Sequence, residues 1–175
     1  MIMDALLLFD GSVGANGALT GTAVNSGTTF TSAAATDSAN IIDVSQIAGS
    51  AKGLARDVGV GDDPDLQIAI EILTAFAGVG ASMQIELQTA PDNGSGVPGS
   101  WSVLNMSPVI AVANLGAGQI NYLDIVPGVQ KFLKLTYLVT GANMTAGAIV
   151  SSIVLDRELL GPQLGYPSGY SNQYV

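Results

Sequence analysis

The chain lacks histidine and cysteine altogether. Without an imidazole or a thiolate, it cannot build a Ser-His-Asp triad, a cysteine nucleophile, a disulfide bond, or the usual zinc, haem-thiolate and iron–sulfur sites. The commonest enzyme chemistries are therefore excluded. We expect a protein that is not an enzyme and that uses no cofactor and no metal.

Charged residues are also scarce, and most of them are acidic. The 175 residues include 14 acidic and 5 basic ones, which gives a formal net charge of −9, and only 11% of all residues are charged. Five cations cannot form the basic stripe that neutralises phosphates, so we expect no direct binding of nucleic acid. About a quarter of the residues in an ordinary soluble domain are charged. The low proportion here favours a largely neutral surface, part of which is an interface.

The chain has one uncharged run long enough to cross a bilayer, residues 135–155. Gly141, Asn143 and Gly147 interrupt this run, and its alternating Thr, Tyr and Val residues are typical of a β-hairpin. The apolar residues 5–9 follow no lysine or arginine, unlike those of a secretory signal. We therefore expect no membrane segment.

The middle of the chain, residues 41–160, is dominated by short β-rich runs separated by turn residues. In residues 66–72 apolar and other side chains alternate, which places one face of a strand in a core and the other in a polar environment. No segment has the 3.6-residue period of an amphipathic helix. The pattern predicts an all-β fold, a single antiparallel β-sandwich. Its expected strands lie at residues 41–47, 66–76, 82–90, 101–112, 119–126, 131–140 and 148–159.

Residues 1–40 are expected to form an extended N-terminal arm. Within residues 11–40, all but five residues are Gly, Ala, Ser, Thr or Asn, and the exceptions are Val13, Leu19, Val24, Phe30 and Asp37. Such a segment buries too little apolar area to order itself alone. It is either disordered or held by another surface. The spaced apolar residues favour docking, so Leu19, Val24 and Phe30 are candidate interface residues.

Residues 161–175 form a C-terminal tail rich in tyrosine. Pro162, Pro167 and three glycines disfavour a regular helix or a central strand. Tyrosine is enriched at protein interfaces because its ring is apolar and its hydroxyl is polar. Tyr166, Tyr170 and Tyr174 are therefore candidate interface residues, with packing of the tail on its own domain as the alternative.

Two glutamates allow one enzymatic hypothesis. A hairpin that turns at residues 78–79 would place Glu71 opposite Glu86, and paired carboxylates about 5 Å apart serve retaining glycosidases. The same register puts both side chains on the outer face of the sheet, away from any buried pocket. A solvated pair or an interface contact is the favoured interpretation.

Three further features have simple structural interpretations. Residues 94–99 match G-x-G-x-x-G, but a strand is expected to follow them where a dinucleotide site needs a helix, so we interpret them as a β–β loop. Asp62, Asp63 and Asp65 could offer oxygens to a cation, but they lack the spacing of a calcium loop. Trp101 is the only tryptophan and favours either the rim of a core or stacking on a sugar.

The segments Ile42-Asp43-Val44 and Gly49–Asp62, the alternating strands 66–76 and 82–89, and the closing strand 153–157 resemble one known family. These motifs, with the Arg-Asp and Gly-x-Gly-acid order of residues 56–62, are similar to those of the jelly-roll capsid cement, or decoration, proteins of short-tailed double-stranded DNA phages. The resemblance covers the middle and the end of the chain.

This resemblance implies a jelly-roll-like sandwich that binds the outer face of an expanded capsid and bridges neighbouring capsomers. The implied partners are a major capsid protein of the HK97-like type and a second copy in a homodimer. The implied location is the virion, after synthesis in the host cytoplasm. The alternative is a carbohydrate-binding β-sandwich module of a phage fibre or secreted protein.

Overall fold

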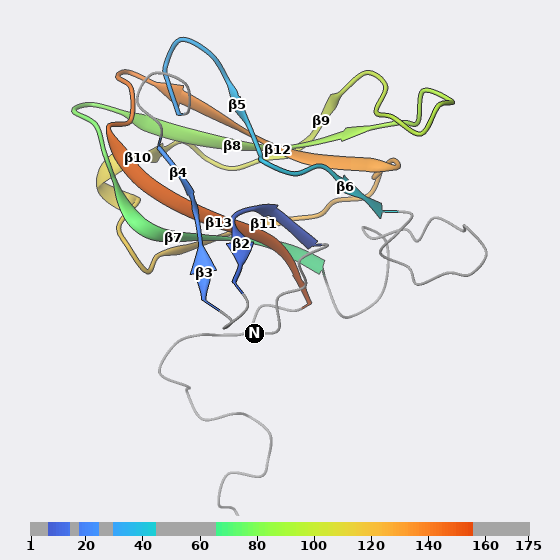
Figure 1. Cartoon of the computed structure of the whole chain (residues 1–175). Coiled ribbons are helices and arrows are strands. Elements are labelled where there is room, and N and C mark those ends of the chain that lie inside the picture. Colours follow the sequence, from blue (N-terminus) through green and yellow to red (C-terminus); the bar gives the residue numbers. More distant parts are fainter. Residues whose placement is uncertain (1–6, 15–17, 25–29, 45–65, 156–175) are drawn as a thin grey trace, which may run out of the picture.

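The structure, a computed structural model, describes residues 7–14, 18–24, 30–44 and 66–155, and Figure 1 shows their arrangement. They form two antiparallel sheets packed face to face, which confirms the all-β sandwich. Sheet 1 contains β1 (Leu8–Asp10), β4 (Thr22–Ala23), β13 (Ala146–Leu155), β7 (Leu66–Ala77) and β11 (Ile120–Asp124). Sheet 2 contains β10 (Ile110–Ala111), β9 (Ser102–Met106), β8 (Ser82–Ala90), β12 (Phe132–Thr140), β5 (Thr36–Asp37) and β6 (Ile42–Asp43).

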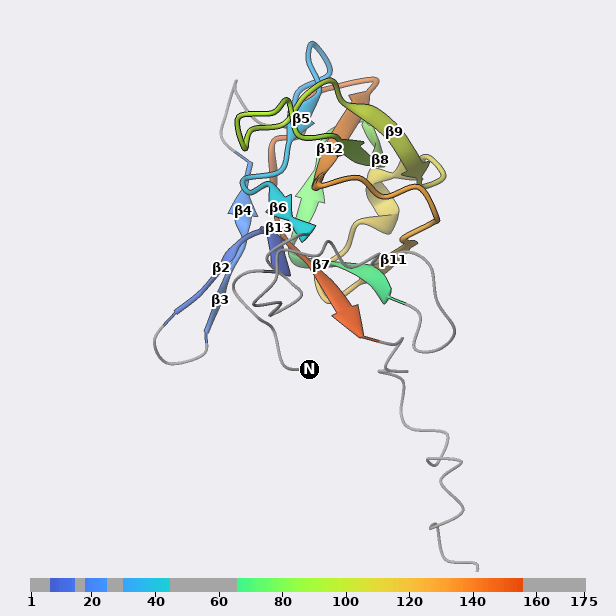
Figure 2. The same cartoon turned by 90° about the vertical axis from the view of Figure 1, so that its right-hand side faces the viewer.

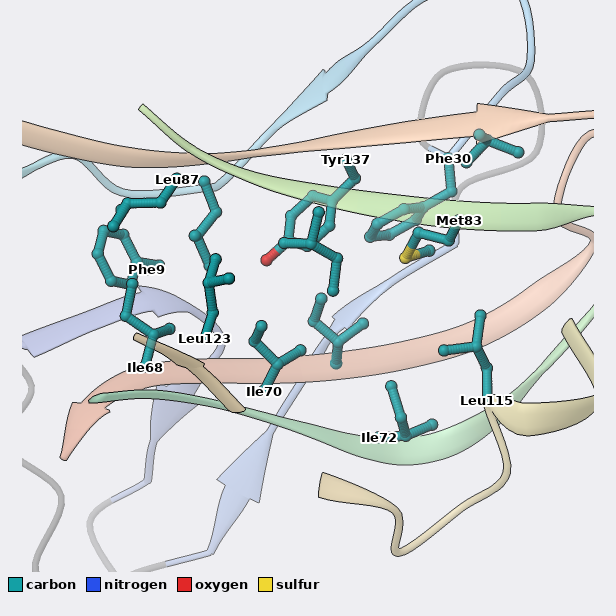
Figure 3. Packing of buried hydrophobic residues seen from close by; sticks show 14 of the residues in the cluster. Phe9, Phe30, Ile68, Ile70, Ile72, Met83, Leu87, Leu115, Leu123 and Tyr137 are labelled. Carbon is teal, nitrogen blue, oxygen red and sulfur yellow. The ribbon is translucent and has the colours of Figure 1, made fainter. Parts of the chain in front are cut away.

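The core lies between the two sheets. The apolar residues of β7 that alternate along the strand, Ile68, Ile70 and Ile72, are at most 1% exposed. They face inward-pointing side chains of sheet 2 that include Met83 and Leu87 (Figure 3). Burial of each large side chain stabilises the fold by about 1.5–3 kcal/mol. Because the apolar side chains of β7 and of β8 each lie on one side of their strand, both strands favour packing of the two sheets face to face.

The connection between β7 and β8 differs from the predicted hairpin. A tight turn, in which the Ala81 amide donates to the Gly78 carbonyl at 3.2 Å, passes the chain from sheet 1 to sheet 2. Glu71 therefore lies on sheet 1 and Glu86 on sheet 2, and the predicted pairing of the two glutamates is wrong. Crossing between sheets brings the apolar sides of both strands into one core, which the alternation alone does not distinguish from a hairpin.

Most of the described N-terminal strands belong to the sandwich, in contrast to the predicted separate arm of residues 1–40. β1 and β4 pair with β13, whereas β5 and β6 pair with β12. These strands are two or three residues long, and they are ordered by the backbone groups of long neighbouring strands. The predicted boundary at residue 40 therefore does not separate an arm from the sheets.

The predicted strand 101–112 is divided into two by an irregular segment. β9 ends at Met106, β10 occupies Ile110–Ala111, and a short 3-10 helix, η2 (Val112–Asn114), follows. Between them, Ser107 donates its amide to the Ile85 carbonyl, and Pro108 has no amide hydrogen to add to a ladder. No helix within the described ranges has the length and apolar character needed to cross a membrane.

Phe30 connects the N-terminal segment to the core. Its side chain is fully buried, with its ring centroid 5.3 Å from those of both Phe76 and Tyr137. Its φ of 53° lies in the left-handed region, at a cost of order 1–3 kcal/mol. The Phe30 amide donates to Thr36 Oγ1 at 2.8 Å and its carbonyl accepts the Met144 amide at 3.0 Å. Aromatic burial and these two bonds offset the strain.

A buried polar cluster joins three strands inside this apolar core. Asp10 on β1 is fully buried, and its Oδ2 accepts the Tyr137 hydroxyl of β12 at 2.5 Å and the Ser151 hydroxyl of β13 at 2.9 Å. Its Oδ1 accepts the Ala39 amide at 3.1 Å. The pKa of Tyr137 is raised well above its ordinary value, mainly by burial and next by the negative charge of Asp10. The hydroxyl therefore stays protonated and acts as a hydrogen-bond donor.

Substitution Tyr137→Phe removes the donor from this cluster and keeps the packed ring. We expect it to lower the free energy of unfolding by about 1–3 kcal/mol, because a buried acceptor loses a partner that water cannot replace. Urea unfolding measures the change. Tyr122→Phe, at a half-buried position on β11, is the matched control and should cost less. Equal stability of Tyr137→Phe and the unmodified protein would contradict a structural role for the cluster.

Gly147 lies where β13 passes over an aromatic ring. Its φ is +138°, and an added Cβ would lie 2.3 Å from Phe76 Cδ1. Gly147→Ala should therefore destabilise the protein by roughly 3 kcal/mol or more through overpacking and backbone strain. Gly80→Ala is the control for a methyl group added in open space, because its φ of +72° lies in the milder left-handed region and nothing lies within 4 Å of the added atom. Its cost should be about 1 kcal/mol in the same thermal or urea unfolding assay. Equal costs at the two positions would refute the steric account.

Candidate interaction surface

The predicted interface residues of the N-terminal segment have different environments. Leu19 on β3 (Leu19–Thr20) is half-buried, and Val24 is half-buried against the core. Phe30 is fully buried in the protein's own core and has no surface to offer a partner, so its assignment to an interface is corrected. Its isolated position in a small-residue segment did not reveal whether its partner was external or internal. Tyr166, Tyr170 and Tyr174 lie outside the described residues.

Leu19 belongs to a two-stranded ribbon formed by β2 (Ser12–Val13) and β3. Ser12 pairs with Thr20 and Val13 pairs with Leu19, and the ribbon extends beyond the edge of sheet 1 (Figure 2). The two strands pair only with each other among the described strands. Most of the ribbon is exposed, and residues 11–21 contain no charged side chain. It is therefore a neutral projection whose two strands pair with no other described strand.

A second surface is the outer face of sheet 2, which we define by the side chains that point away from the core on β8, β9 and β12. Residues that pair across neighbouring strands form rows on this face. In one row Glu86 lies between Met106 and Thr136, and the next row along β8 is centred on Gln88. Thr136 continues its row to Asp37 on β5. The outer face comprises Gln84, Glu86, Gln88, Val103, Met106, Lys134, Thr136 and Leu138.

Apolar side chains are concentrated at the β9 edge of the outer face. Val103 is 46% exposed and Met106 is 50% exposed, and both are on β9. The adjoining loops add Val97 and Val109. Four of the seven exposed large apolar residues in the described ranges thus fall within residues 97–109; the other three are Val13, Ile41 and Val79. Such clustering of exposed apolar groups marks protein contact sites in soluble proteins.

Glu86 is the acidic group in the middle of the outer face. Its Oε2 accepts Gln88 Nε2 at 2.9 Å, which holds the side chain in place. In the part of the chain that the structure describes, no lysine lies within ion-pair distance of it: Lys131 pairs with Asp92, and Lys134 pairs with Asp37. The carboxylate is half-buried between apolar and amide neighbours.

Lys134 on β12 contacts both Asp37 of β5 and Trp101, the residue before β9. Its Nζ donates to Asp37 Oδ2 at 2.7 Å and lies 4.7 Å from the centre of the Trp101 ring. Thr136 Oγ1 donates to the other oxygen of Asp37 at 2.8 Å. One face of the tryptophan ring is therefore occupied by an ammonium group, in a cation–π contact, which leaves less of the ring for stacking on a sugar.

The glycine-rich residues 94–99 form a loop between β8 and β9, as their sequence context predicted. Asp92 Oδ1 accepts the amides of Gly94 and Gly96, each at 2.9 Å, and Asp92 also pairs with Lys131. The hydrogen bond from Lys131, followed by those from Gly96 and Gly94, lowers the pKa of Asp92, and the same pairing raises the pKa of Lys131. The backbone amides that a dinucleotide phosphate would need are bonded to this carboxylate.

The two glutamates of the enzymatic hypothesis lie on different sheets. Glu71 is opposite Val150 and Ile120, whereas Glu86 is opposite Met106 and Thr136. The arrangement lacks the facing carboxylates that the glycosidase hypothesis requires. Among the described residues, no group of three or more acidic side chains is placed to hold a metal ion. Asp62, Asp63 and Asp65 lie outside the described residues.

The fold and its surfaces define an antiparallel β-sandwich with a neutral ribbon and a largely half-buried sheet face that has an exposed apolar edge. A family model described as Bbp16 matches residues 15–153, more than half of the chain. The chain belongs to the Bbp16 family, which is linked to bacteriophages. A search of the curated proteins found no match.

Sequence reasoning missed the β9 edge of the outer face. Val103 and Met106 fall in a segment predicted as one long strand, and their exposure follows from the break at Ser107 and from the edge position of β9. Pro108 was the available signal, because proline occurs at edges and interruptions of sheets.

Proposed function

We propose that the protein is a phage capsid cement, or decoration, protein that binds the outer surface of the coat shell and reinforces contacts between neighbouring capsomers. The exposed apolar edge of the outer face, on a sandwich of a bacteriophage-linked family, is the observation that carries this proposal. A reinforcing protein needs surface to bury against its partner and needs no catalytic residue.

The ribbon formed by β2 and β3 supports the same role. Its uncharged, exposed strands offer backbone groups that could extend a sheet of a neighbouring subunit. Pairing through backbone groups does not depend on charge, which suits a protein with a formal net charge of −9. Tyr166, Tyr170 and Tyr174 are proposed to add aromatic contacts with coat subunits or with a second copy.

The partner is proposed to be a major capsid protein of the HK97-like type, as the sequence resemblance implies. A homodimer is proposed on the same ground. Two linked copies would bind two capsomers together, because binding of the first site raises the effective concentration of the second. Modest contacts repeated over a lattice would then resist rupture of the expanded shell.

Purified capsids of the phage that encodes the chain, prepared without this protein, provide the test. Added protein should co-sediment with expanded capsids to a saturable ratio and should raise the temperature at which they rupture. Binding should also be independent of added oligosaccharides, which distinguishes reinforcement from sugar recognition. Protein that stays in the supernatant at saturating concentration, or that binds a glycan array, would contradict the proposal.

A further inference from the structure

We propose that the outer face of sheet 2 is the surface that contacts the coat, and that Glu86 there receives a lysine or arginine of a coat subunit. This inference rests on the proposed function and adds the surface and the chemistry of the partner. The occupant is an apolar protein patch with one basic side chain.

Several side chains of the outer face are held in place by hydrogen bonds. Gln84 Nε2 donates to the Ser107 carbonyl at 2.9 Å, and Gln88 Nε2 donates to Glu86 at 2.9 Å. Thr136 is held by Asp37 on the other side of the same row. Side chains that are already fixed lose little conformational entropy when a partner binds. The outer face is therefore prepared for contact along three adjacent strands.

The outer face has an imbalance of charge at Glu86. Both lysines of the described ranges are engaged by Asp92 and Asp37, so Glu86 keeps a carboxylate oxygen that Gln88 does not occupy. The exposed residue Met106 lies opposite Glu86, and the exposed residue Val103 lies opposite Gln88 in the next row. A partner that covered these apolar groups would also remove water from Glu86. Such burial is costly unless a cation accompanies it.

The charge of the outer face favours a basic partner over a second copy of the chain. Glu86 lies in the middle of the outer face, so two copies packed through this face around a two-fold axis would bring two carboxylates near each other. Each chain also has an excess of nine negative charges. Like charges at an interface oppose binding, whereas a lysine or arginine on the partner complements the surface. We therefore assign the outer face to the coat, and the dimer contact to another part of the chain.

The test compares Glu86→Gln with Glu71→Gln in the capsid co-sedimentation assay. Glutamine keeps the shape of the side chain and its acceptor for Gln88 while removing the charge. Glu71 is half-buried on sheet 1, so its substitution makes the same change in net charge elsewhere. We expect Glu86→Gln to weaken binding to capsids by about tenfold or more, and Glu71→Gln to change it by less than about twofold. Thermal unfolding verifies that both variants are folded.

A charge reversal, Glu86→Arg, should weaken binding further, because the partner's cation would then face a like charge. Normal binding by both Glu86 variants, with strong binding by the unmodified protein, would overturn this inference and leave the proposed function intact. An equal loss in Glu71→Gln would also overturn it, since the effect would then follow net charge. Failure of the unmodified protein to bind capsids would reject the proposed function itself, and this inference with it.

Discussion

The interaction on which the rest of the structure depends is the buried hydrogen-bond cluster of Asp10, Tyr137 and Ser151. It joins β1 and β13 of sheet 1 to β12 of sheet 2 in the middle of an apolar core. A buried carboxyl group without partners is costly, so the N-terminal strand has to lie where these donors meet it. That placement also brings the carbonyl of Phe9 to the Asn40 amide, at 2.8 Å. The cluster thereby links the N-terminal segment to both layers.

This internal order determines which surfaces are available outside. β1 and β4 both pair with β13, whereas β2 and β3, which lie between them in the sequence, pair with each other. β2 and β3 therefore form a neutral ribbon beyond the edge of the sheet. Because β8 and β12 turn their apolar residues toward the core, Glu86 and its amide neighbours are left on the outer face. The proposed role uses these surfaces: backbone edges and one partly apolar face of the sandwich would make the proposed contacts with a repeating shell.

The strands with strong alternation, such as Leu66–Ala77 and Ser82–Ala90, could be predicted because side chains on a strand alternate between two faces. Their partners could not, since two strands with the same alternation can form a hairpin or face each other across a core. Of the two-residue strands, β6 and β10 fall within the predicted strands 41–47 and 101–112. β4 and β5 were beyond reach, because pairs such as Thr36 with Tyr137 join distant segments. The candidate interface residue Phe30 was only partly predictable from the sequence. An isolated aromatic residue in a neutral segment indicates that its ring packs on a surface, but not whether that surface belongs to the same chain or to a partner.

The most direct test of the proposed cement function is a cryo-EM map of the virion made by the phage that encodes this chain. The account predicts a β-sandwich of this size outside the coat shell, repeated over the lattice, with the outer face of sheet 2 against coat subunits. A shell without such density, or this protein found only in the tail of the particle, would contradict it.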